Sequence, residues 1–144
     1  MASVRRFEVT GPADPGRYRA ASIIDFAVAV LVAMLVFPFP IVRALVAPQV
    51  FIGLVLASIV VAHVVYVSVV LMLWRRTPGM YLLDLGIAGG GIAPIRALAW
   101  GVGAALEFWP QAVGMHPGGL SAGLPSRMSG LELGSADGNG ERRT

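Results

Sequence analysis

The sequence contains no cysteine, no lysine and few charged residues of any kind. Without cysteine, disulfides, thiolate catalysis and thiolate metal sites are excluded. Without lysine, no side-chain amine is available for a Schiff base. Charged residues make up 13% of the 144 residues and hydrophobic residues 56%, whereas a soluble domain carries about a quarter charged residues. This shortage of charge predicts a surface that faces lipid rather than water.

Motifs for catalysis and for phosphate binding are also missing. Gly89–Gly91 lack the Lys-Ser/Thr that completes a phosphate-binding loop, and no nucleophile triad or metal-ligand cluster is found. The pI of about 10.2 comes from arginines that are scattered at the edges of apolar blocks, so nucleic acid is not an expected partner. The sequence predicts a protein that is not an enzyme and uses no cofactor or metal.

Two long apolar runs dominate the first half of the chain. Residues 21–37 form a run of 17 residues with one charged residue, Asp25, and as a helix it measures about 25 Å, close to the minimum for a membrane span. Residues 50–74 form a run of 25 residues without Asp, Glu, Arg or Lys. A buried helix of a soluble protein rarely runs so long without a polar stripe. The pattern predicts an all-α integral membrane protein in which two transmembrane helices form a hairpin.

Arginines flank these two runs unevenly. Four precede the first run, two follow the second, and only Arg43 lies in the loop between them. Because positive residues stay on the cytoplasmic side, we expect a multi-pass protein of the cell membrane with a cytoplasmic N-terminus. A cleaved signal peptide is disfavoured, since the first run starts late and carries Asp25. The six arginines on the cytoplasmic side are Arg5, Arg6, Arg17, Arg19, Arg75 and Arg76.

A third apolar segment, residues 97–115, is interrupted by Glu107 and Pro110. Its length is just sufficient for a span, but the acid lies near its middle and proline breaks helices. It therefore either crosses the membrane once or enters as a re-entrant or interfacial segment. Residues 82–95 alternate loosely around Gly89–Gly91, which predicts a small cytoplasmic β-hairpin or a plain loop.

Composition divides the chain into three parts. Residues 1–16 are polar and contain Gly and Pro, which predicts a flexible lead-in. Residues 17–133 hold the apolar runs and form the membrane domain. Residues 134–144 are polar and rich in Gly, which predicts a disordered tail.

The loop after the second run carries a signal for the start of a helix. Thr77 directly precedes Pro78, and this pair is typical of an N-cap followed by a first-turn proline. Gly79 completes a three-residue loop motif.

Three short motifs follow one another along the membrane domain. They are RYRAASIID at 17–25, TPG at 77–79, and RAL at 96–98 with SRMSG at 126–130. In their order and spacing they resemble the motifs of the RDD family, small bacterial membrane proteins named for one arginine and two aspartates. The likeness covers about residues 17–133.

The resemblance implies a bacterial membrane protein of a kind often supposed to take part in transport. Asp25 matches the first aspartate of the family, and Arg17 and Arg19 flank the place of its arginine. The lysine of the family is Met80 here, and its second aspartate is Ser126. A member with these departures is expected to keep the fold and to lose the chemistry that the missing residues served.

Asp25 is the first candidate for a functional residue. A charged aspartate at the membrane centre costs on the order of 3 kcal/mol, and less near the interface. Either Asp25 takes part in transport or proton movement, or an arginine neutralises it and so holds the helices in place. Arg17 and Arg19 are not ideal i,i+4 partners, so arginines from other segments fit equally well. The candidate charge cluster is Arg17, Arg19, Asp25 and Arg96, with Arg75 and Arg76 as further partners for the aspartate.

His63 and Glu107 rank below Asp25. His63 lies near the middle of the second run, where an imidazole could relay protons with Asp25. A difference in depth of about 10 Å argues against their contact, and a neutral histidine that serves packing is favoured. Glu107 is expected at a membrane interface, where its neighbour Trp109 is typical.

Two functions fit these observations. The chain is either an accessory or scaffolding subunit that packs beside other membrane helices, or a transport-related protein that acts as an oligomer. A single intramembrane acid without a polar lining favours the first function, and the family resemblance favours the second. The expected partners are the lipid bilayer and either further copies of the chain or a larger membrane complex. Close helix packing is favoured by small residues at helical spacing, namely Ala29 and Ala33, Gly53 and Ala57, and Ala97, Gly101 and Ala105.

Overall fold

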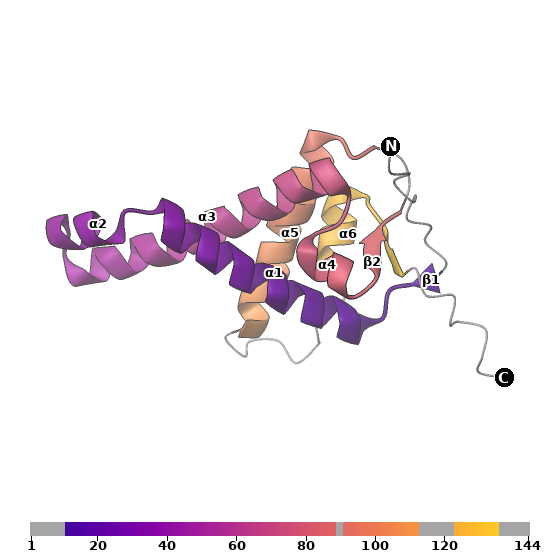
Figure 1. Ribbon diagram of the computed structural model, residues 1–144, viewed down its shortest axis with the longest axis horizontal. Coiled ribbons are helices and arrows are strands. Elements are labelled where there is room, and N and C mark those ends of the chain that lie inside the picture. Colours follow the sequence, from indigo (N-terminus) through magenta and orange to yellow (C-terminus); the bar gives the residue numbers. More distant parts are fainter. Residues whose placement is uncertain (1–10, 89–90, 113–122, 136–144) are drawn as a thin grey trace.

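The computed structural model describes residues 11–88, 91–112 and 123–135 (Figure 1). Most of the described residues are helical. The helices are α1 (Pro15–Val36), α2 (Phe39–Leu45), α3 (Pro48–Trp74), α4 (Pro78–Leu82), α5 (Pro94–Ala112) and α6 (Gly123–Ser129). The strands are β1 (Gly11–Pro12), β2 (Leu85–Ile87) and β3 (Leu133–Ser135).

The two longest helices, α1 and α3, lie side by side and run in opposite directions, with α2 between them in the chain (Figure 1). Helix α1 begins earlier than the apolar run because Asp14 caps it. The Asp14 side chain accepts a hydrogen bond of 3.2 Å from the backbone nitrogen of Arg17, and Pro15 occupies the first turn. Helix α3 ends at Trp74 and is capped by Arg75, whose φ of 61° places it in the left-handed conformation that closes many helices.

Within the described residues, α1 and α3 are long and apolar enough to cross a membrane. This confirms two such helices at the predicted places. Only 22% of the most apolar stretch of α1 is buried, and only 28% of the most apolar stretch of α3. Neither helix is therefore covered like the core helix of a soluble domain. Helix α5 does not meet the same criterion, so the predicted third span is not confirmed.

The third apolar segment forms one continuous helix, α5. It begins at Pro94, three residues before the predicted start, and continues to Ala112. The prediction that the helix breaks at Pro110 was wrong, because the backbone stays helical through this residue. Proline removes one hydrogen bond from the helix, and here it lies only two residues before the helical end. The rest of the predicted segment, residues 113–115, lies outside the described residues.

The three strands form a small antiparallel sheet in the order β1-β3-β2. The predicted β-hairpin within residues 82–95 was wrong, because β2 pairs with β3, with Leu85 opposite Ser135 and Ile87 opposite Leu133. Strand β3 also takes in Gly134 and Ser135, which the sequence had assigned to the tail. The remaining tail residues, 136–144, lie outside the described residues.

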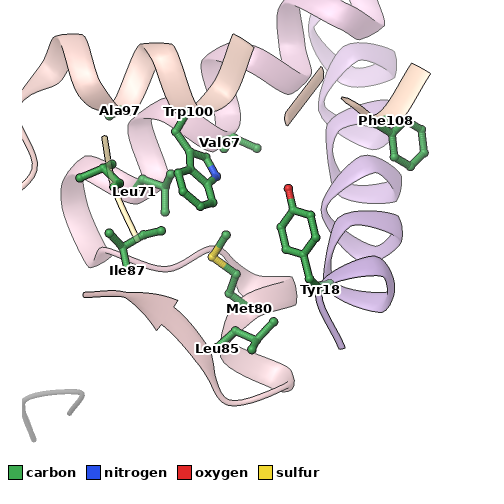
Figure 2. Close-up of a cluster of buried hydrophobic side chains, with 11 residues drawn as sticks. Tyr18, Val67, Leu71, Met80, Leu85, Ile87, Ala97, Trp100 and Phe108 are labelled. Atoms are coloured by element: carbon green, nitrogen blue, oxygen red, sulfur yellow. The ribbon is translucent and has the colours of Figure 1, made fainter. Parts of the chain in front are cut away.

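The apolar core lies at the end of the α1–α3 pair where α1 begins and α3 ends, under α4, α5, α6 and β2 (Figure 1). Trp100 and Leu71 are its largest fully buried apolar side chains, and Figure 2 shows them in one cluster with Met80, Ala97 and Ile87. The opposite end of the α1–α3 pair, with α2, extends away from this core. The core thus fixes one end of the pair and leaves the other end uncovered.

Glycines permit two close helix contacts around the core. A Cβ on Gly101 would lie 2.6 Å from the Oγ of Ser68 and 2.8 Å from the carbonyl oxygen of Val64, so α5 approaches α3 at this point. A Cβ on Gly103 would lie 2.7 Å from the Cα of Pro125, so α6 approaches α5. The small residues predicted to favour helix packing are buried on α1 (Ala29 and Ala33) and on α5 (Ala97, Gly101 and Ala105). On α3, by contrast, Gly53 has open space around it and Ala57 is exposed.

Candidate functional site

Asp25 is buried, with 4% of its surface exposed. Three donors converge on its carboxylate. The hydroxyl of Thr77 donates to Oδ2, the backbone nitrogen of Gly79 donates to Oδ1 at 2.9 Å, and the hydroxyl of Tyr66 donates to Oδ1 at 3.3 Å. The carboxylate of α1 is therefore held by α3 and by the start of α4 at the same time.

The start of α4 is shaped to present these donors. Thr77 is the N-cap, and its side-chain oxygen accepts a hydrogen bond of 3.2 Å from the backbone nitrogen of Met80, which confirms the predicted N-cap and first-turn proline, Pro78. Gly79 lies so close to α1 that a Cβ would come within 2.3 Å of the carbonyl oxygen of Ala21. Only glycine allows the backbone N–H to reach Asp25 at this distance. The Thr77–Gly79 motif thus forms a binding site for the Asp25 carboxylate.

The arginines named as partners for Asp25 are engaged elsewhere or exposed. Arg75 donates from Nη2 to the carbonyl oxygen of Ile87 at 3.2 Å, and the guanidinium of Arg76 lies 4.3 Å from the centre of the Tyr81 ring.

Of the candidate charge cluster itself, Arg19 and Arg96 are exposed and Arg17 is half-buried in the first turn of α1. The expected arginine contact is replaced by the neutral donors of Thr77, Gly79 and Tyr66, which occupy about three of the four acceptor positions of the carboxylate.

His63 lies at nearly the same depth as Asp25. Asp25 is ten residues after Pro15 (25 − 15) and His63 is eleven residues before Trp74 (74 − 63), so both lie about 15–17 Å from the paired helix ends. The predicted difference of about 10 Å was wrong, because it measured depth from the start of the apolar run rather than from the capped start of α1.

The two residues line one small cavity of about 10 Å³. We call it the junction cavity, because α1, α3, α4 and α5 all contribute to it. Its polar side chains are those of Tyr18, Ser22, Asp25, His63, Thr77 and Trp100. Figure 2 shows the hydroxyl of Tyr18 and the indole nitrogen of Trp100 directed toward the same space.

His63 is also buried among aromatic rings. Its surface is 2% exposed, and the rings of Phe26 and Phe108 lie edge-on to it with centroid distances of 6.0 and 6.1 Å. Within the described residues, its Nδ1 atom has no hydrogen-bond partner. The ring is therefore held by packing, while one of its nitrogens has no hydrogen-bond partner in the part of the chain that the structure describes.

Glu107 lies one residue before Phe108 on α5 and is half-buried. The neighbouring aromatic side chains pack against α1, because the Phe108 ring stacks on that of Phe26 with centroids 4.4 Å apart. Trp109 also contacts Phe26, edge-on at 5.8 Å. This part of α5 therefore contributes to the aromatic packing against α1.

A second hollow separates the outer parts of α1 and α3. This α1–α3 groove has a volume of about 520 Å³, and its walls are almost entirely apolar. It lies away from the core, toward Phe37 and Pro38 at the end of α1. Residues that line it include Val32, Val36, Val61, Val65, Tyr66 and Val69.

Sequence reasoning missed Tyr18, Ser22, Tyr66 and Trp100 as polar neighbours of Asp25. Tyr66 of α3 and Trp100 of α5 approach Asp25 across helices, whereas Tyr18 and Ser22 lie seven and three residues before it on α1. One signal was present: Asp14 before Pro15 has the same capping pattern as Thr77 before Pro78, and it would have placed the helix start and the depth of Asp25 correctly.

No protein-family model, curated protein or solved structure matches this chain. Within the ranges that the structure describes, no group of three or more His, Asp or Glu side chains could hold a metal ion.

Proposed function

We propose that this chain is an integral membrane protein that acts as an accessory or scaffolding subunit beside other membrane helices. The observation that carries the proposal is the uncovered apolar surface of α1, α2 and α3. Leu35, Val36 and Leu45 are exposed by 77–79%, and large aliphatic side chains continue along the outer half of α3. An apolar surface of this extent is stable in lipid or against a partner, whereas in water it promotes aggregation.

The α1–α3 groove supports a helical partner. In a bilayer, helices associate through close packing rather than through the hydrophobic effect, so a groove between two helices is a favourable place for a third. The buried polar residues Asp25, His63 and Thr77 line the junction cavity, which shares no lining residue with the groove. The groove therefore offers shape and apolar contact, which suits assembly better than the passage of a polar solute.

The contacts of Asp25 support a structural role for the acid. A carboxylate that accepts three hydrogen bonds from the protein is well compensated for burial. These contacts join α1 to α3 and to α4, so they hold the two long helices at a fixed distance. The proposed role of Asp25 is to keep the groove in shape.

We further propose the orientation and the family. The arginine distribution supports a multi-pass protein of a bacterial cell membrane with its N-terminus and the loop at 75–80 in the cytoplasm. Two motifs that carry the resemblance to the RDD family meet in space, since Asp25 of the first binds Thr77 and Gly79 of the second. This contact gives a physical reason for the two motifs to occur together.

A transport-related function, with the chain acting as an oligomer, is the second candidate. The observation that favours it is the junction cavity, which brings Asp25 and His63 to one place. Both side chains can change protonation state, and such pairs occur in proton pathways. Against this function, the junction cavity is small, and the α1–α3 groove, which shares no lining residue with it, is almost entirely apolar.

The test of the proposed function is co-purification in mild detergent with two matched variants. Val61 lines the α1–α3 groove and Val50 does not, yet both are exposed valines of α3. We expect Val61→Trp to release the partner subunits or to lower the particle mass, because the indole fills the groove. Val50→Trp should leave both unchanged. Partners retained by Val61→Trp at the level of the unmodified chain would contradict the groove as the contact surface.

A further inference from the structure

We propose that the junction cavity holds one internal water molecule that bridges His63 to Asp25. The proposal starts from the size of the cavity. Its volume of about 10 Å³ is close to the smallest space that accommodates a single water. The polar side chains of Asp25 and His63 line this same space.

His63 supplies the first reason for a polar occupant. Its Nδ1 is buried without a hydrogen-bond partner from the described residues, and buried polar atoms in folded proteins almost always have one. The imidazole is 2% exposed and lines the cavity. A water in the cavity would complete the hydrogen bonding of this ring.

Asp25 supplies the second reason. A carboxylate has about four acceptor positions, and three are used: two on Oδ1 by Gly79 and Tyr66, and one on Oδ2 by Thr77. One position on Oδ2 remains for a further donor. The water donates to Oδ2 and hydrogen-bonds to His63, and it accepts from the hydroxyl of Tyr18 or Ser22. Three partners is the usual number for a buried water.

A metal ion fits this space less well than water. Calcium and magnesium require six or more oxygen ligands, and zinc requires several nitrogen, sulfur or carboxylate ligands with open lone pairs. Here one imidazole and one remaining carboxylate position are available. The chemistry of the cavity therefore selects a neutral ligand that both donates and accepts.

The bridging water would add His63 to the contact between α1 and α3 that Tyr66 already makes by donating to Asp25. Asp25 of α1 and His63 of α3 then belong to one hydrogen-bonded unit, together with the start of α4. The junction cavity shares no lining residue with the α1–α3 groove, so the test of the bridging water does not depend on the proposed partner helix.

The experiment detects contact between water and the His63 ring by NMR, in lipid nanodiscs with nitrogen-15 histidine. The chain has two histidines, so His116→Gln leaves His63 as the only labelled ring. We expect a cross-peak between water and the ring of His63 in this variant. This variant changes no residue that lines the cavity. Absence of the cross-peak in it would overturn the proposal.

Two further variants distinguish a water molecule in the cavity from bulk water that reaches the His63 ring. Ala104 lines the cavity, whereas Ala99 on the same helix does not. In the His116→Gln background, Ala104→Val fills the space and should abolish the cross-peak, while Ala99→Val should retain it. A cross-peak of equal strength in both variants would also overturn the proposal.

Discussion

The carboxylate of Asp25 accepts a hydrogen bond of 2.9 Å from the backbone N–H of Gly79, 54 residues further along the chain. This bond ties the first long helix to the short helix that follows the second one. It forms because Gly79 has no side chain where α4 meets the backbone of Ala21. The geometry of the α1–α3 pair therefore depends on one glycine and one buried acid.

Replacing Gly79 by alanine should destabilise the protein. The added Cβ would lie 2.3 Å from the Ala21 carbonyl oxygen, so α4 must move away from α1 and lengthen the bond to Asp25. We expect a loss of about 2–3 kcal/mol in the free energy of unfolding, in the range of overpacked sites. Thermal unfolding of the purified protein in detergent measures it. Gly53→Ala is the control, since open space surrounds Gly53 on α3, and it should raise stability by up to about 1 kcal/mol.

Substitutions of Asp25 and its donors should form a graded series. Tyr66→Phe removes one of three donors and should cost about 1 kcal/mol. Asp25→Asn keeps the shape and one acceptor oxygen, so it should cost more than Tyr66→Phe but less than Asp25→Ala. Asp25→Ala leaves the donors of Thr77 and Gly79 unpaired, and each unpaired group costs about 1–3 kcal/mol. Protein abundance in membranes and the unfolding midpoint measure the order, and an Asp25→Ala variant as stable as the unmodified chain would contradict the role of the acid.

The sequence predicted the elements of this fold better than their contacts. The apolar runs identified α1 and α3, and Thr77-Pro78 identified the start of α4, because these features depend on neighbouring residues. The partners of Asp25 could not be found in the same way. Thr77 lies 52 residues away and Tyr66 lies 41 residues away, and the choice between them and an arginine depends on how the helices pack.

The pairing of β2 with β3 could not be predicted for a similar reason. Two strands of three residues each carry almost no periodic signal, and they are separated by α5 and α6. The glycines at 89–91 instead suggested a local turn. The depth of His63 relative to Asp25, by contrast, was within reach of the sequence, because Asp14 marks the true start of α1.

The orientation of the helices can be tested with single cysteines, since the chain has none of its own. Gln49 at the start of α3 and Tyr81 on α4 are both exposed, and they are expected on opposite sides of the membrane. In intact cells, a membrane-impermeant maleimide should label Gln49→Cys at once and Tyr81→Cys only after the cells are permeabilised. The reverse pattern would show that the arginine-based orientation is wrong.

Flux measurements in liposomes distinguish the accessory-subunit function from the transport-related function. We expect the purified chain to show no proton or cation flux that depends on Asp25, because the acid is engaged by protein donors and the α1–α3 groove is apolar. The comparison is between the unmodified chain and Asp25→Asn, with particle size checked by gel filtration. Flux that Asp25→Asn abolishes, while the particle stays intact, would favour the transport function.

The most direct measurement of the central claim is photocrosslinking in native membranes from position 61, in the α1–α3 groove. Leu56 is the control, because it is exposed on the same helix but does not line the groove. The photoreactive residue is placed at one position at a time, and the adducts are identified by mass spectrometry. If another membrane helix occupies the groove, position 61 should give one discrete protein adduct and position 56 only lipid or background. Lipid adducts alone at position 61, or the same proteins at both positions, would contradict the account.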